Sequence, residues 1–216
     1  MATLLLAAVG PMQSWGTRSK FDDRDTEREP SKSGILGLVC AALGRDRNEP
    51  IDDLRRLKMG VRCDREGELR KDFQTAQDVA TAGGGKKSII SNRWYLADAA
   101  FLVGLEGDEK LLAQIYVALK SPCWPLALGR KSYVPSKGPW LPDALYYKEL
   151  LKALIDYPAL DDNAKDQKSK VRFVLESSEK TPNIRMDDPV SFALHKRKFE
   201  RRYVDFVYME RRDVFQ

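Results

Sequence analysis

The feature that most constrains the fold is an uninterrupted stretch of small and apolar residues at positions 34–44. Ser31 or Ser33 can cap the N-terminus of a helix there, and Gly44 can end that helix in the left-handed conformation. Such a helix is apolar on nearly every face, so it must be buried, and it is too short to span a bilayer. Two roles remain open: a core helix, or a helix whose N-terminus binds a phosphate beside Lys32.

Two glycines in this stretch, Gly34 and Gly37, predict a close approach by another backbone. A larger side chain at these positions should prevent the helix from packing. We therefore expect Gly37→Leu to give insoluble protein.

The segments around this helix predict an α+β fold. Residues 3–9 and 99–105 are apolar, and residues 58–63 alternate between polar and apolar side chains, which indicates three strands. Asp108 can cap a second helix that runs to about Lys120. The order strand, helix, strand, long insertion, strand and helix is most of a split β-α-β, ferredoxin-like (RRM-type) unit.

The insertion, residues 71–92, contains almost no core-forming residues and is too long for an ordinary connection. We interpret it as a protruding arm or hairpin with a flexible tip at residues 83–88 (GGGKKS). The tip is not an ATP-binding P-loop, because that motif needs glycine where Ala80 stands and Ser or Thr where Lys87 stands. Its cations either contact a polyanion or are simply solvated.

The second half of the chain is predicted to be a small β-rich part with mixed α+β structure. Asp143 can cap a helix that continues through Ile155. Residues 171–175 and 203–209 have the composition of strands.

Two densely charged segments, residues 17–30 and 161–170, are expected to be loops in solvent. Neither has the composition of a true linker. We therefore divide the chain into residues 1–125, which hold the ferredoxin-like unit and its arm, and residues 126–216, which pack on the first part.

Positive charge is modest in total but concentrated in a few places. The 216 residues include 37 Lys or Arg and 32 Asp or Glu, which gives a formal net charge of +5 and a pI of about 9.0. A basic bias favours a polyanionic partner. Besides the arm tip, cations cluster at residues 128–132 (LGRKS) and 195–203 (HKRKFERRY).

These two clusters suggest phosphate and RNA contacts. The first is a glycine turn with two cations and a hydroxyl group, which are good phosphate ligands. The second interleaves basic and aromatic residues, and bases can stack on rings while cations hold the backbone. Alternatively, Phe199 and Tyr203 point inward from an exposed basic face. His195 can be a nuclease base, an RNA contact or a structural residue.

The chain has cysteines at positions 40, 63 and 123 and a single histidine. The odd number of cysteines and the lack of a C-x-x-C pair argue against disulfides and favour a reducing compartment. With a single histidine, a zinc site would have to combine distant ligands, so we expect none. Residues 1–9 lack the basic region of a signal peptide and are followed by Gly10 and Pro11, so we interpret them as a strand. We expect a cytoplasmic protein without a cofactor.

Several motifs together resemble those of the CasD-type subunits of the type I-E CRISPR Cascade complex, in the RAMP superfamily. Two follow the first strand: residues 10–16 (GPMQSWG) and 30–38 (PSKSGILGL). The later ones are residues 72–75 (DFQT), 95–101 (YLADAAF), 128–132 (LGRKS) and 185–189 (RMDDP). Each motif is modest alone, but their joint order is specific and covers most of the chain.

The resemblance implies a non-catalytic subunit that caps the 5′ handle of the CRISPR RNA. It also implies a ferredoxin-like core in which residues 71–92 are a β-hairpin thumb that folds over the RNA and packs against the adjacent backbone subunit. The large subunit of the complex would contact the protein as well. A related protein of the type I-C branch cleaves repeat RNA with Tyr, Lys and His together, and that trio has no counterpart that we can place here.

Two other function classes remain as alternatives. One is a metal-independent repeat-RNA endonuclease that uses His195 as its acid or base. The other is a small-molecule enzyme, which would need a pocket with convergent titratable groups, and the sequence shows no such pattern.

We predict no catalytic residue and no metal ligand. The residues expected to contact RNA carry cationic, hydroxyl, amide or aromatic side chains and are Gln13, Trp15, Arg18, Lys32, Ser33, Lys86, Lys87, Ser88, Arg93, Arg130, Lys131, Ser132, Arg197 and Arg201.

Overall fold

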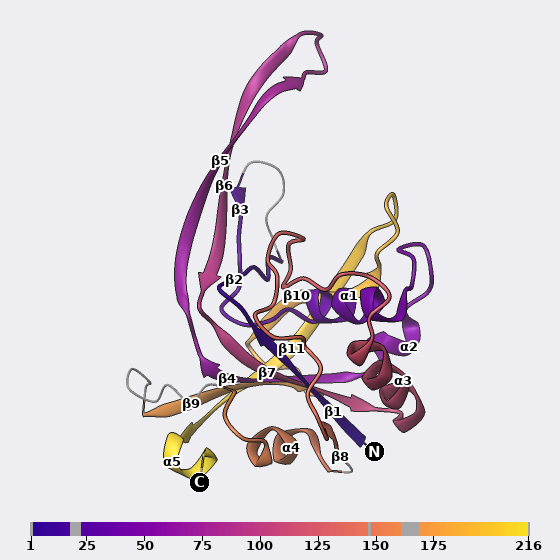
Figure 1. Cartoon of the computed structure of the whole chain (residues 1–216), viewed down its shortest axis with the longest axis vertical. Coiled ribbons are helices and arrows are strands. Elements are labelled where there is room, and N and C mark those ends of the chain that lie inside the picture. The colour runs from indigo at the N-terminus through magenta and orange to yellow at the C-terminus, as the bar shows by residue number, and fades with distance from the viewer. Residues whose placement is uncertain (1, 18–22, 147, 161–168, 216) are drawn as a thin grey trace.

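The computed structural model describes residues 2–17, 23–146, 148–160 and 169–215. Its larger sheet has seven strands in the order β10-β11-β9-β4-β7-β1-β8, and helices lie on both faces of this sheet (Figure 1). A smaller sheet joins β5 and β6 to two short strands, β2 and β3. The predicted α+β class is therefore confirmed.

The strands are β1 (Ala2–Val9), β2 (Met12–Gln13), β3 (Asp23–Arg24), β4 (Lys58–Arg65), β5 (Glu68–Ala80), β6 (Lys86–Ala97), β7 (Ala100–Gly107), β8 (Leu145–Tyr146), β9 (Lys170–Ser177), β10 (Ile184–Ser191) and β11 (Lys198–Glu210). The helices are α1 (Lys32–Leu43), α2 (Asp52–Arg55), α3 (Glu109–Lys120), α4 (Leu150–Asp156) and α5 (Arg211–Val214).

Strand β7 lies between β1 and β4 and is antiparallel to both. The three strands predicted at residues 3–9, 58–63 and 99–105 are these three. The second half of the chain extends the sheet at both edges, since β8 pairs with β1 and β9 pairs with β4. One continuous sheet thus contains strands from both sides of position 125, and the division into two parts there stays a prediction.

Helix α1 forms where its sequence predicts it. Ser31 Oγ accepts a hydrogen bond from the Gly34 amide at 3.3 Å, and Gly44 ends the helix with a φ of +72°. Asp108 caps α3 in the same way, because its Oδ1 accepts from the Leu111 amide at 2.9 Å. Both helices lie on one face of the larger sheet and bury their apolar sides in the main core (Figure 1).

The two glycines of α1 have different surroundings. A Cβ atom on Gly34 would lie 2.8 Å from the ring of Trp15, whereas one on Gly37 would meet no atom of the described residues within 4 Å. The expectation that Gly37 is a site of close approach is therefore wrong. Gly34 alone holds that position, and its neighbour is an indole ring, not another backbone.

We predict that Gly34→Ala lowers the free energy of unfolding by about 1–3 kcal/mol, because the new methyl group displaces Trp15 from a packed core. Gly37→Ala should raise it by up to about 1 kcal/mol, because alanine favours helix over glycine. Urea unfolding of both variants measures the difference. Equal stability of the two would contradict the contact between Gly34 and Trp15.

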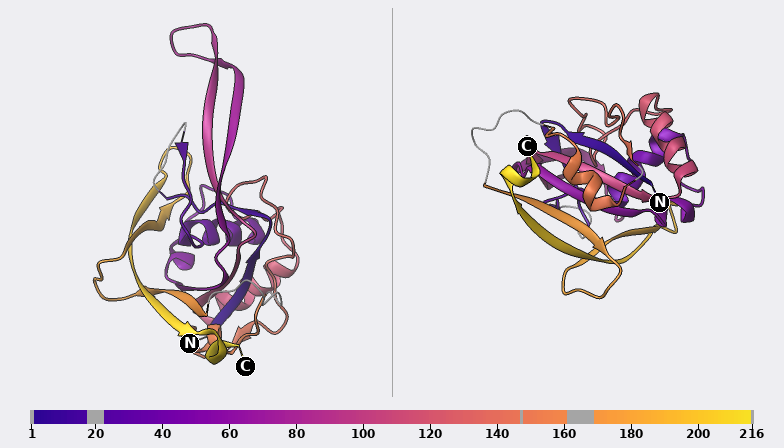
Figure 2. Two further views of the ribbon diagram at one scale, coloured as in Figure 1. Left: turned by 90° about the vertical axis from the view of Figure 1, so that its left-hand side faces the viewer. Right: turned by 90° about the horizontal axis from the view of Figure 1, so that it is seen from below.

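Helix α4 covers the opposite face of the larger sheet, below the strands in Figure 1 and toward the viewer in the right-hand view of Figure 2. Its residues Leu150, Ala153 and Leu154 pack with Leu5 of β1 and Leu102 of β7 in a second core. This face is therefore not free for bases to stack on, as they stack on the open sheet of an RRM.

The helix of the second half begins later than predicted. Asp143 has a φ of +50° and lies in a turn, while α4 begins at Leu150 after Glu149. The segment before α4 instead extends the sheet, because the Leu5 amide donates to the Ala144 carbonyl at 2.8 Å. Aspartate favours turns as well as helix caps, so Asp143 alone could not distinguish them.

Strands β5 and β6 form a hairpin that projects from the body (Figures 1 and 2). We call residues 68–97 the thumb. Its strands pair from Glu68 opposite Ala97 to Ala80 opposite Lys86, so it is longer than the predicted arm at 71–92. Two short strands attach its base, since β2 pairs with residues 96–97 and β3 pairs with Asn92 and Arg93.

The charged segment 17–30 is more ordered than predicted. Residues 18–22 lie outside the described residues, but β3 pairs with the thumb and Glu29 is only 3% exposed. The predicted loop at 161–170 falls mostly on residues 161–168, which also lie outside the described residues.

The strands predicted at residues 171–175 and 203–209 lie within β9 and β11. Strand β11 begins earlier, at Lys198, so most of the basic run belongs to a strand. Strand β10 was not predicted, because Pro189 and several charges interrupt it. Proline is tolerated there since β10 is the edge strand of the sheet.

Within the described residues, no helix has the length and hydropathy needed to cross a membrane, and no three His, Cys, Asp or Glu side chains group to hold a metal ion. The three cysteines are unpaired. Burial raises the pKa of Cys40 to about 11 and raises the pKa of Cys63 well above its ordinary value. Both thiols therefore stay protonated at neutral pH.

Candidate nucleic-acid interface

Residues 128–133 form a turn that is fixed on the body beside the thumb. Gly129 has a φ of +90°, and a Cβ atom there would lie 1.7 Å from the Ser14 carbonyl oxygen, so only glycine fits. The Ser14 amide donates to Leu128 O at 3.1 Å, and the turn is closed by Leu128 N to Tyr133 O at 2.8 Å and Tyr133 N to Arg130 O at 2.9 Å. The turn is thereby held at both ends.

Arg130 reaches from this turn to the base of the thumb. Its Nη2 donates to the Trp94 carbonyl of β6 at 3.1 Å and to the Arg24 carbonyl of β3 at 3.3 Å. Its Nη1 donates to the Tyr133 hydroxyl at 2.8 Å, and the guanidinium lies 5.3 Å from the centre of that ring. These acceptors are neutral, and no carboxylate of the described residues forms an ion pair with Arg130. Its positive charge therefore remains available to an anion.

Further predicted RNA contacts lie around Arg130. Lys131 and Ser132 are exposed on the same turn. Arg93 is half-buried on β6, next to Trp94, and its Nε donates to Ser91 Oγ at 3.4 Å. Because Arg130 binds the Trp94 carbonyl, the fold brings Arg93 close to three consecutive predicted residues that are distant from it in sequence. We call Arg93, Arg130, Lys131 and Ser132 the thumb-base cluster.

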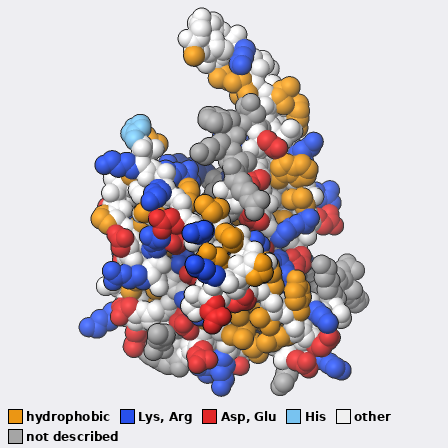
Figure 3. All heavy atoms as spheres, turned by 180° about the vertical axis from the view of Figure 1, so that it is seen from behind, with side chains coloured by type: hydrophobic (Ala, Val, Ile, Leu, Met, Phe, Trp, Pro, Cys, Tyr) orange, Lys and Arg blue, Asp and Glu red, His pale blue; other side chains and the backbone are white. Residues whose placement is uncertain are grey.

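Two other groups of predicted residues lie apart from this cluster. Lys86, Lys87 and Ser88 are exposed near the thumb tip, where β6 begins. Arg197 and Arg201 are exposed on the hairpin of β10 and β11, and the Arg197 guanidinium lies 5.1 Å from the centre of the Phe199 ring. Figure 3 shows Lys and Arg side chains over both the body and the thumb on one face of the molecule.

Gln13 and Trp15 have structural roles. Their exposed fractions are 0% and 1%. The Gln13 amide nitrogen donates to Ala8 O at 3.0 Å and Ala99 O at 2.7 Å, and its oxygen accepts from Trp15 Nε1 at 3.2 Å. Neither side chain is accessible to RNA in this structure.

Lys32 is also occupied within the protein. Its Nζ lies 2.9 Å from Glu176 and 3.7 Å from Asp188, and its side chain is 3% exposed. Its amide donates to Asp187 Oδ2 at 2.8 Å, so a carboxylate already binds the N-terminus of α1. This arrangement fills the phosphate site that the sequence suggested.

Of the two remaining predicted residues, Ser33 is half-buried and donates to Ser31 Oγ at 3.5 Å. Arg18 lies outside the described residues.

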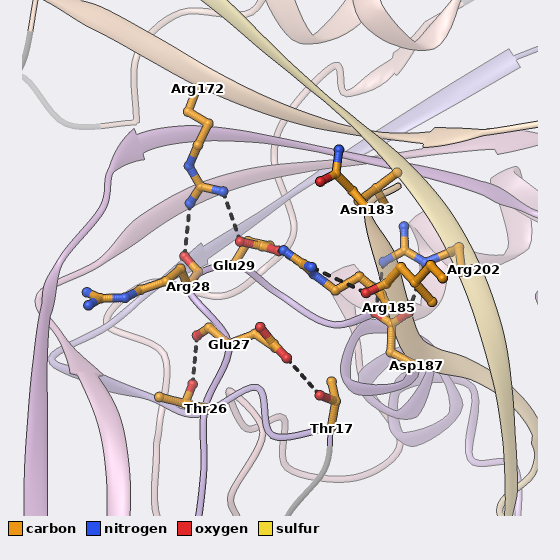
Figure 4. A network of polar contacts seen from close by, with 12 residues as sticks. Thr17, Thr26, Glu27, Arg28, Glu29, Arg172, Asn183, Arg185, Asp187 and Arg202 are labelled. Carbon is orange, nitrogen blue, oxygen red and sulfur yellow. Dashed lines mark hydrogen bonds and ion pairs between the residues drawn. The ribbon is translucent and has the colours of Figure 1, made fainter. Parts of the chain in front are cut away.

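A charged network joins the 26–29 segment to the C-terminal strands (Figure 4). Glu29 accepts hydrogen bonds from Arg172 at 2.9 Å and from Arg185 at 2.7 Å. Arg202 binds Asp187 at 2.8 Å. Burial alone would lower the pKa of Arg172 and Arg202, but their hydrogen bonds to carboxylates raise both above the ordinary value. These cations are neutralised inside the fold and are not free to bind RNA.

The family model for the CRISPR-associated protein (Cas_Cas5) matches residues 3–205 of this chain. The chain belongs to the Cas5 family. The CRISPR system Cascade subunit CasD of Escherichia coli (strain K12) is 32% identical over 174 residues, which cover 71% of this chain and 76% of that protein. The resemblance to CasD-type Cascade subunits is therefore confirmed.

Two solved structures are similar over nearly the whole chain. One, described as the crystal structure of a Cas protein, has a TM-score of 0.81 and 42% identity and covers 99% of this chain and 98% of its own. The other is a chain of a CRISPR RNA-guided surveillance complex, with a TM-score of 0.79 and 33% identity, covering 96% of this chain and 90% of its own.

In this Cas5-family chain, sequence reasoning missed the charged network of the C-terminal strands. A signal was present, since Arg185 and Asp187 on β10 are two residues apart, as are Arg202 and Val204 on β11, and residues with this spacing share one face of a strand. Residues 17–30 were predicted to be a loop in solvent and residues 195–203 an RNA-binding or exposed basic face, because charged residues are seldom buried without partners.

Proposed function

We propose that this Cas5-family chain is a non-catalytic, RNA-binding subunit of a type I-E Cascade complex that caps the 5′ handle of the CRISPR RNA. The observation that carries the proposal is Arg130, which forms no ion pair within the described part of the chain, beside exposed Lys131 and Ser132 at the thumb base. The names of the CasD relative and of the surveillance complex agree with it. The unpaired cysteines favour the cytoplasm as its location.

The strand order β4-β7-β1-β8, with α1 and α3 on one face, supports a ferredoxin-like core for this function. Since α4 covers the other face, we place the RNA at the edge of the body from which the thumb projects. There its phosphates contact the thumb-base cluster, and Lys86 and Lys87 near the thumb tip add further contacts. Arg197 and Arg201 on the β10–β11 hairpin offer a second, separate set of cations.

The thumb also supports a protein partner. Leu69, Phe73 and Ile90 are 39%, 60% and 53% exposed, and the pairing of Thr75 with Ile90 puts these apolar side chains on one face. A line of apolar side chains runs along the thumb in Figure 3. We propose that the adjacent backbone subunit covers this face. The large subunit would contact the body.

The first test of RNA binding uses Lys131→Ala. Loss of one phosphate contact should weaken binding of single-stranded RNA regardless of sequence and make the slope of log affinity against log salt shallower by about 0.7. Lys152→Ala is the control, since Lys152 is also exposed but lies on α4, beneath the opposite face of the sheet. Fluorescence anisotropy at several salt concentrations gives both slopes. Identical slopes for the two variants would refute a phosphate contact at Lys131.

The alternative function, repeat-RNA cleavage with His195, has less support. His195 is exposed in the turn before β11, and no side chain of the described residues orients it by a hydrogen bond. We expect that neither the purified protein nor His195→Ala cleaves labelled repeat RNA in the absence of metal. Cleavage at a defined position that disappears in His195→Ala would establish the endonuclease instead.

A further inference from the structure

We infer that Arg130 is a positioning residue: it fixes the orientation of the thumb on the body, and an RNA phosphate at the thumb base tightens this attachment. The first half rests on contacts within the protein. The second half rests on the proposed function.

The outer edge of β6 has a gap in its pairing, and Arg130 fills it. Strand β2 pairs with residues 96–97 of β6, and β3 pairs with residues 92–93. The Trp94 carbonyl lies between the two pairings, where no strand offers it a donor. It accepts instead from Arg130 Nη2 at 3.1 Å and from Ser14 Oγ at 3.2 Å. Two side chains thus replace the missing strand contact.

Arg130 also joins three segments that no single strand connects. From the 128–133 turn it reaches β6 through Trp94 O and β3 through Arg24 O. The guanidinium of Arg130 is fixed by the Tyr133 hydroxyl and lies over that ring, and the ring of Tyr95 on β6 packs tilted against Tyr133 with ring centres 6.1 Å apart. A planar guanidinium can satisfy these acceptors together, whereas a lysine ammonium at the end of a flexible chain cannot.

Among the described residues, the body holds the thumb near its base. The strands of the thumb run over residues 68–80 and 86–97, but the body pairs with them through the two-residue strands β2 and β3, and Leu96 at the end of β6 is buried in the main core. A long hairpin that is attached only at its base can change its orientation relative to the body unless contacts at the base fix it. An RNA phosphate that binds the remaining N–H groups of Arg130 would restrict the guanidinium further and reduce this motion.

The test measures the distance between the thumb tip and the body by spin labelling. Cys123 is exposed and provides the body label, whereas Cys40 and Cys63 are buried. Ala82→Cys, at the exposed tip, provides the other label. In the labelled protein that retains Arg130, we expect the distance between the two labels to have one narrow distribution. Both Arg130→Lys and Arg130→Ala should lose this single narrow peak. Lys131→Ala, the neighbouring exposed cation, should keep the narrow peak.

The lysine variant separates position from charge. Because Arg130→Lys keeps the cation, it should bind a single-stranded oligouridylate with a nearly unchanged salt slope. Its distance distribution should nevertheless be broad. A simple loss of folding would not produce this combination. Oligouridylate should narrow the distribution of the Arg130 protein and not that of Arg130→Ala. An unchanged distribution in both Arg130 variants would overturn the positioning role. Bound oligouridylate that leaves the Arg130 distribution unaltered would overturn the coupling, whereas failure of the Arg130 protein to bind it would refute the proposed function alone.

Discussion

Asp64→Ala is expected to lower the free energy of unfolding by about 3–5 kcal/mol, because it leaves the Arg62 charge buried without a counter-ion. Both side chains are fully buried, and Arg62 Nε lies 2.6 Å from Asp64 Oδ1. Asp64 also accepts from the Leu160 amide at 2.8 Å, so the variant leaves that donor unsatisfied as well. Equilibrium urea unfolding measures the loss.

A matched control shows whether burial is the cause. Arg70 and Glu68 form an ion pair on the thumb with side chains 59% and 72% exposed, so Glu68→Ala should cost about 1 kcal/mol or less. The double variant Arg62→Met with Asp64→Leu should recover part of the loss, because the unpaired charge is gone. It should not recover all of it, since Arg62 also donates to the carbonyls of Leu154, Tyr157 and Pro158. A loss no larger than that of Glu68→Ala would show that the buried pair does not stabilise the fold.

A truncated thumb is expected to abolish incorporation into the complex while the body stays folded. The cut lies inside the predicted arm at residues 71–92, because Asn92 pairs with β3 and the Trp94 carbonyl binds Arg130. Linking Gln74 to Ser91 with a short Gly-Ser turn removes residues 75–90 at a paired position. Most of the removed residues are exposed, so the thermal midpoint should hardly change. Co-purification with the other Cascade subunits measures incorporation.

A single substitution tests the same surface. Phe73→Ser should reduce incorporation, whereas Tyr208→Ser, whose side chain is equally exposed at 60% but lies on β11, should not. A large fall in the thermal midpoint of the truncated protein would mean that the thumb stabilises its own body. Normal incorporation of the truncated protein would refute a thumb-mediated contact.

Local sequence signals predicted the elements well where the interaction is itself local. Ser31 binds the amide of Gly34, three residues away, and Asp108 binds that of Leu111. The thumb was predicted from its shortage of apolar residues, since a long segment with few of them cannot form a core. The prediction of a helix cap at Asp143 failed because aspartate is common both in turns and at helix caps. Only the contact between Ala144 and strand β1 distinguishes the two.

The predicted site residues divide according to whether their partners are near in sequence. Exposure of Lys131, Ser132 and the tip lysines follows from polar surroundings. By contrast, Gln13 binds Ala99 across 86 positions, Lys32 binds Glu176 across 144, and Glu29 binds Arg185 across 156. No local pattern specifies such partners.

The sequence by itself therefore determined the buried α1, the three central strands, the protruding hairpin and the family resemblance, since each depends on side chains within a few positions of one another. The tertiary structure decided which cations are free. Lys32, Arg172, Arg185 and Arg202 look as available in the sequence as Lys131 does, but folding surrounds them with carboxylates. Arg130 stays available to an anion because, among the described residues, it binds only neutral oxygen atoms, at the point where the thumb meets the body.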